Sequence, residues 1–345
     1  MIKVEKYGII LSATEKEFES KGVLNPGIYQ EDDKLHILYR AIQEGNFSSI
    51  GYAETKGPLK VVKRLEKALI KPELNYEKKG VLDARIVNIE DTFYITYAAY
   101  DGVNTLGALA TSKDLIHIEK HGIITPQLNY EDYKKCVTNK KNSKLNPKYL
   151  FYYNLFSEIG ALEDRFRLLS VKDVVLFPKK IRGQFALLLS IWPGIQIAYF
   201  DNFKDLTKEY WHNFFENLID HIVLDPRSVF EANHMGVGGP PIETEYGWLL
   251  IYYGVQETTT GKSICAKAAL LQIDKPEIEI SRIDEPIFAP TKTWEKIGHA
   301  DEIVFPTGHS VFEDALYIYY GAADKTIAVA KLSLKELLTE LLKNT

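Results

Sequence analysis

The chain has 345 residues, of which 46% are hydrophobic and 26% are charged, and its formal net charge is −5 at pH 7. This share of apolar residues supports a large buried core and excludes an intrinsically disordered chain. The acidic balance, with Lys and Arg scattered along the chain, argues against a nucleic-acid partner. No apolar run is long enough to cross a membrane, so we expect no membrane partner either.

A short run of β-branched and aromatic residues, ended by a small or polar residue, occurs five times. The five copies span residues 35–41, 93–102, 185–190, 248–255 and 316–324. They lie 58, 91, 64 and 67 residues apart when measured between Tyr39, Tyr97, Leu188, Tyr252 and Tyr319. Strand-rich units at such intervals are typical of β-propeller blades. We therefore predict an all-β fold, a five-bladed β-propeller in which residues 1–345 form a single domain around one axial pocket.

Three segments outside the repeats have their own patterns. The longest interval contains an insertion near residues 126–163 that is first basic and then aromatic. We expect a solvated loop over the mouth of the propeller, or else a lid that brings Tyr152 or Tyr153 to a sugar. Residues 205–224 carry apolar side chains at helical spacing, which predicts a surface helix. A capping-box pattern at residues 333–336 and a leucine stripe after it predict a C-terminal amphipathic helix packed on the body.

Cys136 and Cys265 are the only cysteines, too few for a disulfide framework or a zinc cluster. The N-terminal residues have no apolar signal-peptide core, so we expect a cytoplasmic protein. Calcium-loop, zinc-protease and nucleophile-elbow motifs are missing from the sequence. We therefore expect no cofactor and no metal, and we leave a homo-oligomer open.

Polar residues recur just ahead of an apolar segment in four of the five repeats. The matching positions are Asn25, Asp83, Lys172 with Asp173, Gly238, and Asp301 with Glu302. Equivalent positions in repeated blades are related by symmetry around the axis, so we expect a ring of polar groups at one pocket. The alternative is turn chemistry, because Asp and Asn favour turns wherever they occur.

Two charged residues interrupt or end apolar repeats. Arg40 lies inside LYRA, and Asp324 ends GAAD. Burying a charge is costly unless it is paired or faces a polar site. These residues therefore belong either to the same pocket or to a structural ion pair.

Taken together, these segments resemble glycoside hydrolase family 130, five-bladed propellers that cleave β-mannosides. The matching segments are NPGI with LYRA, LDARIVNIEDTFYITYAAYDG, KDVVLFPKKIRGQF, GVGGPPIETEYGWLLIYYGV and YYGAADKTIAVA. The resemblance implies a β-mannoside oligosaccharide as the substrate. Most members of the family are phosphorylases that break the bond with inorganic phosphate, and a smaller group are hydrolases that use water.

The resemblance also implies an acid and the residue that orients it. The family has Glu-Asp-Pro-Arg where this chain has Leu82-Asp83-Ala84-Arg85. Asp83 would be the general acid, passing its proton through a sugar hydroxyl, and Arg85 would orient it. The departures at Leu82 and Ala84 leave a non-catalytic carbohydrate-binding propeller as an alternative.

Four further residues match family positions that contact the substrate. Asn25 and Arg40 would hold the mannose in the cleavage subsite, and Asp324 would bind its hydroxyl groups. Lys172 matches a family lysine near the phosphate or water site.

Three cationic positions of the family's phosphorylases are replaced in this chain. Leu106 stands in place of an Arg, residues 189–191 in place of His-Arg-Pro, and Tyr252-Tyr253-Gly254 in place of Tyr-His-Gly. Phosphate needs charge-assisted donors, and each lost one weakens binding by roughly 1.5–3 kcal/mol. With Lys172 as the remaining cation and Tyr253 as a substrate contact, we expect hydrolysis, and phosphorolysis is the alternative.

Inverting hydrolysis needs a second carboxylate about 6.5–9.5 Å from the acid, to activate water. Glu231, in VFEANHMGVGGPPI, matches a family Trp-Glu position beside the pocket and is the first candidate for this base. A substrate hydrogen bond without proton transfer is the alternative role, and Asp301 and Glu302 are the other candidate bases. The sequence thus predicts an inverting glycosidase that acts on β-1,2-mannooligosaccharides, with Asp83 as acid and Glu231 as base.

Overall fold

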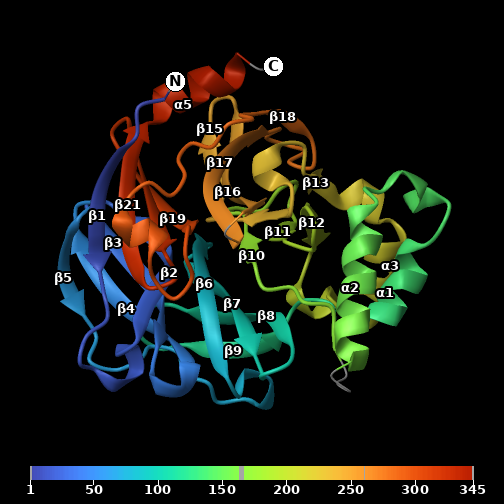
Figure 1. The fold of residues 1–345 in the computed structure, drawn as a ribbon, viewed down its shortest axis with the longest axis horizontal. Coiled ribbons are helices and arrows are strands. Elements are labelled where there is room, and N and C mark those ends of the chain that lie inside the picture. Colours follow the sequence, from blue (N-terminus) through green and yellow to red (C-terminus); the bar gives the residue numbers. More distant parts are fainter. Residues whose placement is uncertain (1, 163–166, 260, 344–345) are drawn as a thin grey trace.

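The computed structural model describes residues 2–162, 167–259 and 261–343. The chain is mostly β, and its strands form five antiparallel groups that follow one another along the sequence and surround a common centre (Figure 1). We call these groups blades 1 to 5. Every sheet in the described ranges has open edges. The arrangement is consistent with the five-bladed propeller that the repeats predict.

Four blades follow one another before the last blade closes the ring. Blade 1 contains β2 (Gly22–Glu31), β3 (Lys34–Ile42), β4 (Ser48–Lys56) and β5 (Lys60–Arg64). Blade 2 contains β6 (Gly80–Ile89), β7 (Thr92–Tyr100), β8 (Thr105–Ser112) and β9 (Glu119–Ile123). Blade 3 contains β10 (Val174–Leu176), β11 (Phe185–Leu189), β12 (Ile195–Phe200) and β13 (Ile222–Leu224). Blade 4 contains β14 (His234–Val237), β15 (Ile242–Thr244), β16 (Gly247–Thr258), β17 (Gly261–Leu271) and β18 (Glu279–Arg282).

Blade 5 is built from both ends of the chain. Its strands are β19 (Val304–Phe312), β20 (Ala315–Ala322), β21 (Thr326–Ser333) and the N-terminal β1 (Glu5–Leu11). β1 pairs with β21 in antiparallel register. The ring is therefore closed by backbone hydrogen bonds between the first and the last strand, and Figure 1 shows the two termini on the same side of the molecule.

The first strand of four blades is interrupted at a matching position. The pairing of β2 with β3 shifts between Leu24 and Gly27, and the pairing of β6 with β7 shifts between Leu82 and Arg85. Blade 4 has its first strand split into β14 and β15, and β19 shifts register after Pro306. An irregularity of this kind bends a strand and redirects a side chain. Asn25 and Asp83, the polar residues noted in the sequence, therefore lie in strand irregularities and not in ordinary turns.

A buried glutamate is repeated in four blades. The four side chains, all 0% exposed, belong to Glu19, Glu77, Glu231 and Glu295. Each accepts a hydrogen bond of 2.7–2.8 Å from a tyrosine hydroxyl of its own blade, in the order Tyr39, Tyr97, Tyr252 and Tyr320. Each also pairs with a cation from the third or fourth strand of that blade, in the order Arg64, Lys120, Lys267 and Lys6. We call these groups the blade glutamates, and their repetition marks them as part of the architecture.

The blade glutamates correct one equivalence drawn from the sequence. The tyrosine that matches Tyr39, Tyr97 and Tyr252 in blade 5 is Tyr320, and not Tyr319. The Tyr319 hydroxyl instead donates to the backbone oxygen of Pro58 in blade 1, at 2.7 Å. Successive side chains of a strand point to opposite faces, so an alignment that is off by one residue selects the wrong face of β20.

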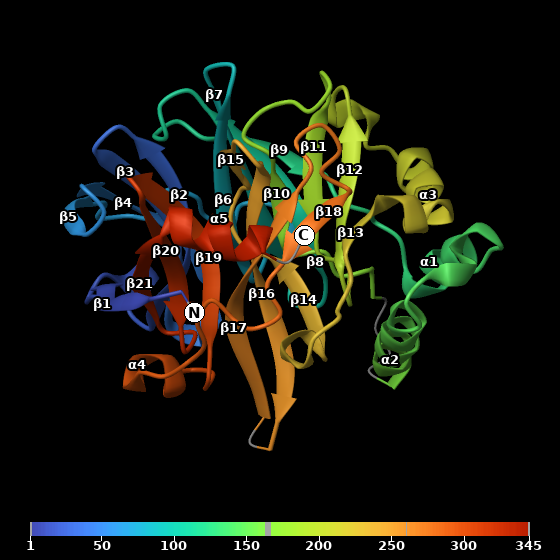
Figure 2. The same cartoon turned by 90° about the horizontal axis from the view of Figure 1, so that it is seen from above.

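Three helices lie beside blade 3 at the edge of the molecule (Figures 1 and 2). They are α1 (Tyr130–Val137) and α2 (Lys148–Leu162) of the insertion, and α3 (Lys208–Glu216) of the segment predicted to be helical. Aromatic residues of all three helices share one apolar cluster with strands of blade 3. The insertion is therefore a packed helical pair and not the solvated loop we expected, because its aromatic side chains are buried against the blade.

Two further helices lie near the end of the chain. α4 (Thr293–Lys296) precedes β19, and α5 (Leu334–Leu342) follows β21. The Ser333 hydroxyl caps α5 by accepting the backbone N–H of Glu336 at 3.1 Å. Leu337, Leu338 and Leu341 of α5 are buried in an apolar cluster with blades 4 and 5. Across the described ranges, none of the helices combines the length and the apolar character needed to span a bilayer.

Candidate active site

Asn25 and Asp83 occupy the matching irregularities of β2 and β6 and are bonded to each other. Nδ2 of Asn25 donates to Oδ1 of Asp83 at 2.8 Å. Their φ angles are 50° and 52°, a left-handed conformation that non-glycine residues rarely adopt and that Asn and Asp tolerate best. Both side chains are largely buried, at 4% and 6% exposure. The two irregular strands thus bring an amide and a carboxyl group of neighbouring blades together near the centre.

Arg85 lies next to Asp83 and fixes its backbone. Nη1 of Arg85 donates to the backbone oxygen of Asp83 at 2.7 Å, and Nε donates to the backbone oxygen of Gly238 at 2.6 Å. Nη2 lies 3.9 Å from Oδ1 of Asp173. Because Gly238 belongs to blade 4 and Asp173 precedes blade 3, this one side chain ties blade 2 to two other blades. Its buried charge is balanced by Asp83 and Asp173.

Asp173 is a central carboxylate to which the sequence analysis gave no individual role. Its Oδ2 accepts the hydroxyl of Tyr253 at 2.6 Å. Burial and the negative charge of Asp173 raise the pKa of Tyr253, so this phenol stays protonated and remains a donor. The Tyr253 ring packs on Phe305 with centroids 4.5 Å apart. Tyr253 was expected to contact the substrate, and in the structure its hydroxyl holds Asp173. The sequence feature that could have singled out Asp173 is its place directly after Lys172, at the recurring polar position.

Asp324 is influenced by the charges of Arg40, Lys172 and Asp83. Asp324 is half-buried, and burial raises its pKa, while the charges of Arg40 and Lys172 oppose this rise and the charge of Asp83 adds to it. Arg40 donates from Nε to the hydroxyl of Ser48 at 2.9 Å. The electrostatic environment of Asp324 thus includes Asp83 and the two cations.

Three buried polar atoms of this centre lack a hydrogen-bond partner among the residues that the structure describes. They are Oδ1 of Asn25, Nη2 of Arg85 and Oδ1 of Asp173. Buried polar atoms are almost always hydrogen-bonded, which marks these three as candidate contacts for a polar ligand, although Nη2 of Arg85 and Oδ1 of Asp173 already face each other at 3.9 Å. The set combines carboxyl groups, a guanidinium and an amide, which suits proton transfer and the binding of hydroxyl groups or an anion.

Glu231, the first candidate for the base, does not belong to this centre. It is the blade glutamate of blade 4, with Lys267 Nζ at 2.9 Å and the Tyr252 hydroxyl at 2.7 Å. Burial acts to raise the pKa of Glu231, but the charge of Lys267 and the backbone donors outweigh it and leave the pKa lowered. A fully enclosed carboxylate with all these partners has no access to water or to a sugar. Its geometry is that of a structural residue, which corrects the expectation that it is the base.

Asp301 and Glu302, the alternate bases, lie in the segment between α4 and β19. Asp301 is exposed and accepts the backbone N–H of Gly298 at 3.2 Å. Glu302 lies 3.9 Å from Lys296. Within the described parts of the chain, neither is hydrogen-bonded to the central residues, so this position of blade 5 does not continue the ring of polar groups. The residue of β19 that matches Asn25 and Asp83 is Pro306.

Comparison with known proteins shows a clear likeness over the whole chain. The family model described as beta-1,4-mannooligosaccharide phosphorylase, glycoside hydrolase family 130, matches residues 12–204 and 157–343. A 1,2-beta-oligomannan phosphorylase of Thermoanaerobacter sp. (strain X514) is 30% identical over 98% of this chain and 99% of its own length. A beta-1,2-mannobiose phosphorylase of the same strain is 29% identical over 93% of each chain.

Solved structures with 21–22% sequence identity share the fold. The beta-1,2-mannobiose phosphorylase of Listeria innocua, in complex with beta-1,2-mannobiose, matches 99% of this chain and 100% of its own, with a TM-score of 0.73. A structure described by the words "The GH130 family of mannoside phosphorylases contains glycoside hydrolases that target beta-1,2 mannosidic linkages in Candida mannan" matches 97% of this chain and 94% of its own, with a TM-score of 0.72. Phosphorylases and hydrolases are thus both represented on this fold.

Proposed function

Because the chain belongs to glycoside hydrolase family 130, we propose that it cleaves β-1,2-linked mannooligosaccharides by phosphorolysis and releases mannose 1-phosphate. The names of the relatives from Thermoanaerobacter support phosphorolysis over the hydrolysis that the sequence led us to expect. We further propose that residues 1–345 act as one five-bladed domain with the reaction at its centre. The observation that carries the proposal is the bonded pair of Asn25 and Asp83 on matching irregular strands.

Asp83 is the general acid of the proposed reaction. Its Oδ1 accepts the amide of Asn25, so Oδ2 is the oxygen that carries the proton. A phosphate oxygen attacks C1 of the terminal mannosyl unit, the bond between C1 and the leaving oxygen breaks, and the proton of Asp83 moves to that oxygen. The family resemblance implies that a sugar hydroxyl relays this proton. Because attack comes from the face opposite the leaving group, the configuration at C1 is inverted.

The remaining central residues bind the sugar and the phosphate. Oδ1 of Asn25, which is unpaired within the described structure, accepts a hydroxyl of the mannosyl unit. Asp324 accepts further hydroxyl groups, and Arg40 lies close enough to oppose its pKa rise. Lys172 supplies the positive charge for phosphate, which it meets as a point charge and not as a bidentate fork. Arg85 holds Asp83 in place through its backbone oxygen.

Hydrolysis is the second candidate, because three positions that are cationic in the family's phosphorylases hold no charge here. Leu106 is buried, and the Ser190 hydroxyl accepts the backbone N–H of Val237 at 2.9 Å. Tyr253 is bonded to Asp173. If water replaces phosphate, we propose Asp324 as the base, since burial raises its pKa and so strengthens it as a proton acceptor.

Product analysis separates these functions. We would incubate the protein with β-1,2-mannobiose and with β-1,4-mannobiose, each with and without inorganic phosphate. Mannose 1-phosphate that forms only with phosphate is the expected product. Free mannose formed equally in both conditions would reject phosphorolysis and establish hydrolysis. Sugar binding without any turnover would reject both and leave a carbohydrate-binding protein.

A further inference from the structure

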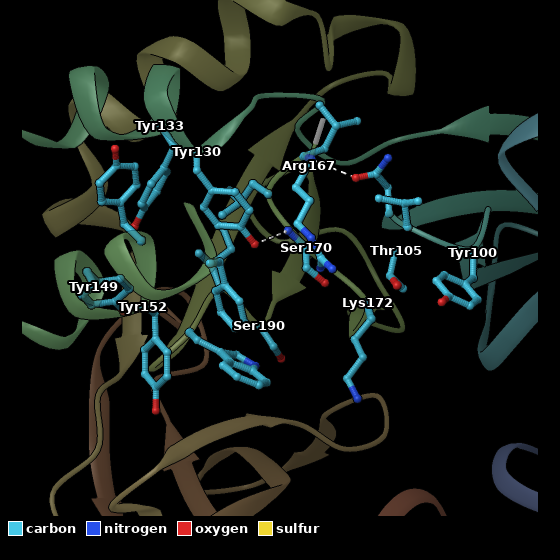
Figure 3. Close-up of a pocket in the computed structure, with 18 residues that line it drawn as sticks. Tyr100, Thr105, Tyr130, Tyr133, Tyr149, Tyr152, Arg167, Ser170, Lys172 and Ser190 are labelled. Carbon is cyan, nitrogen blue, oxygen red and sulfur yellow. Dashed lines mark hydrogen bonds between the residues drawn. The ribbon is translucent and has the colours of Figure 1, made fainter. Parts of the chain in front are cut away.

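A cavity of about 410 Å³ lies between the helical insertion and blades 2 and 3. This volume is within the range of about 300–1,000 Å³ that is typical of small-ligand sites. In Figure 3, tyrosines of α1 and α2 stand along one side of the cavity, and Tyr100 and Thr105 of blade 2 stand on the opposite side. Lys172 and Ser190 lie between the two walls (Figure 3). The cavity is thus a product of the insertion that makes the second interval between repeats the longest.

The aromatic wall of the cavity is held in place from behind. The Tyr152 hydroxyl donates to the backbone oxygen of Asn233 at 2.6 Å, and the Tyr152 ring meets Trp192 edge-on with centroids 5.3 Å apart. The Tyr149 hydroxyl donates to Asp225 at 2.9 Å. A wall fixed in this way is preformed, so a ligand does not have to order it on binding.

The lining has the chemistry of a carbohydrate site. One face of the Trp192 ring is covered by His234, with centroids 3.6 Å apart. The part of the ring that lines the cavity can offer apolar surface to the C–H groups of a pyranose, and the hydroxyls of Thr105 and Ser170 can bond its hydroxyl groups. The charged residues of the lining are cations, with Lys172 among them. A neutral, hydroxyl-rich chain fits this mixture better than a purely apolar molecule does.

The cavity borders the proposed active site at Lys172. Lys172 lines it, while the next residue, Asp173, faces Arg85 and Tyr253 at the centre. Ser190, also in the lining, donates its backbone N–H to the backbone oxygen of Asp173 at 3.2 Å. Nζ of Lys172 lies 5.5 Å from the centre of the Phe305 ring, the same ring on which Tyr253 packs. The boundary between the two sites is therefore a single residue.

We propose that this cavity binds mannosyl units of the leaving chain and makes the protein favour longer β-mannooligosaccharides over the disaccharide. The proposal rests on the proposed function, because it takes the bond cleaved at Asp83 as the starting point of the chain. A chain whose terminal unit sits at Asn25 and Asp83 extends past Lys172 onto the aromatic wall.

Chain-length dependence in variants of Trp192 tests this proposal. The wild-type ratio of kcat/KM for β-1,2-mannotriose to that for β-1,2-mannobiose is expected to exceed one, and Trp192→Ala is expected to lower it on the order of tenfold. Trp192→Phe keeps a ring face and retains most of the ratio. Phe203→Ala is the control for loss of an aromatic ring, because Phe203 packs against the apolar cluster that contains the cavity residues Tyr149 and Tyr153 without itself lining the cavity. An unchanged ratio in a folded Trp192→Ala protein would overturn the proposal.

Equilibrium binding distinguishes failure of the site from failure of the reaction. Calorimetric titration of Asp83→Asn with β-1,2-mannotriose measures binding without turnover, and adding Trp192→Ala is expected to weaken it on the order of tenfold. Weaker binding would support the cavity even if the wild type cleaved no mannoside, an outcome that rejects only the proposed function. Equal affinity in both proteins would reject the cavity as a sugar site whatever the activity of the wild type.

Discussion

The side chains of Asn25 and Asp83 meet at 2.8 Å although 58 residues separate them in the chain. Both residues have positive φ inside a strand, at 50° and 52°. Such conformations cost roughly 1–3 kcal/mol each, persist only where the surrounding fold imposes them, and cluster at functional sites. Two of them joined by one hydrogen bond indicate a position that the fold holds for chemistry, and this relationship leads to the first two predictions.

Asp83→Asn is expected to lower kcat by about 10²–10⁴-fold, because the amide has no proton to give to the leaving oxygen. The midpoint of thermal unfolding should change little, since Asn tolerates the left-handed backbone as well as Asp does. Initial rates on β-1,2-mannobiose with phosphate, together with a melting curve, check both parts. Asp91→Asn is the matched control, because Asp91 has φ 58° in an exposed turn between β6 and β7. Full activity in Asp83→Asn would remove this residue from the acid role.

Asn25→Asp is expected to place a second carboxyl group beside Asp83 and to replace an N–H donor with an acceptor. Two carboxylates at this distance cannot both ionise easily, so one apparent pKa of the pair rises. The pH optimum of kcat/KM should move upward, and activity at pH 7 should fall by about tenfold or more, because the mannosyl contact changes as well. A pH–rate profile shows the result. A profile identical to that of the wild type would mean that the two side chains are not coupled.

Glu231→Gln is expected to destabilise the protein while leaving the folded fraction active. The substitution leaves the buried ammonium of Lys267, 0% exposed, without its counter-ion, and breaking a buried pair in this way costs about 3–5 kcal/mol. Glu295→Gln should behave alike, since it is the blade glutamate of blade 5 and pairs with Lys6. Denaturant unfolding measures the stability of both variants, and rates per folded molecule measure their activity. Inactivation by Glu231→Gln alone, in well-folded protein, would restore Glu231 as a candidate base.

Stability is expected to fall as the pH drops from about 6.5 towards about 4, partly because of His309 in β19. Burial lowers the pKa of His309 to about 4. In the folded protein the ring is then neutral at pH 5, whereas in the unfolded chain it is protonated, so acid favours unfolding across this window. His309→Gln should flatten the decline, which melting temperatures measured between pH 7 and pH 4 would reveal. The blade glutamates Glu77, Glu231 and Glu295, whose pKa values are lowered, add a further loss at lower pH. An unchanged slope in the His309 variant would exclude the histidine as a cause.

Several features of the site could be anticipated from the pattern of repeats. Counting back 14 residues from Tyr39 and Tyr97 led to Asn25 and Asp83, because repeated blades keep the same distance between their first and second strands. The same counting failed in blade 5, where neighbouring tyrosines obscured which of them, Tyr319 or Tyr320, bonds the blade glutamate. It also passed over Asp173, since nothing in a linear pattern shows that a carboxylate has Tyr253 and Arg85 as neighbours.

The sequence by itself determined the number of repeats, the family likeness and the residue proposed as the acid, because these depend on spacing along the chain and on local alternation of side chains. Only the tertiary structure decided that Glu231 is enclosed by Lys267 and Tyr252, and that the insertion folds into helices bordering an aromatic cavity. A carboxylate takes its role from the charges and donors packed around it, and these come from strands far away in the sequence. The partners of each charged group are therefore settled when the blades close around a common centre.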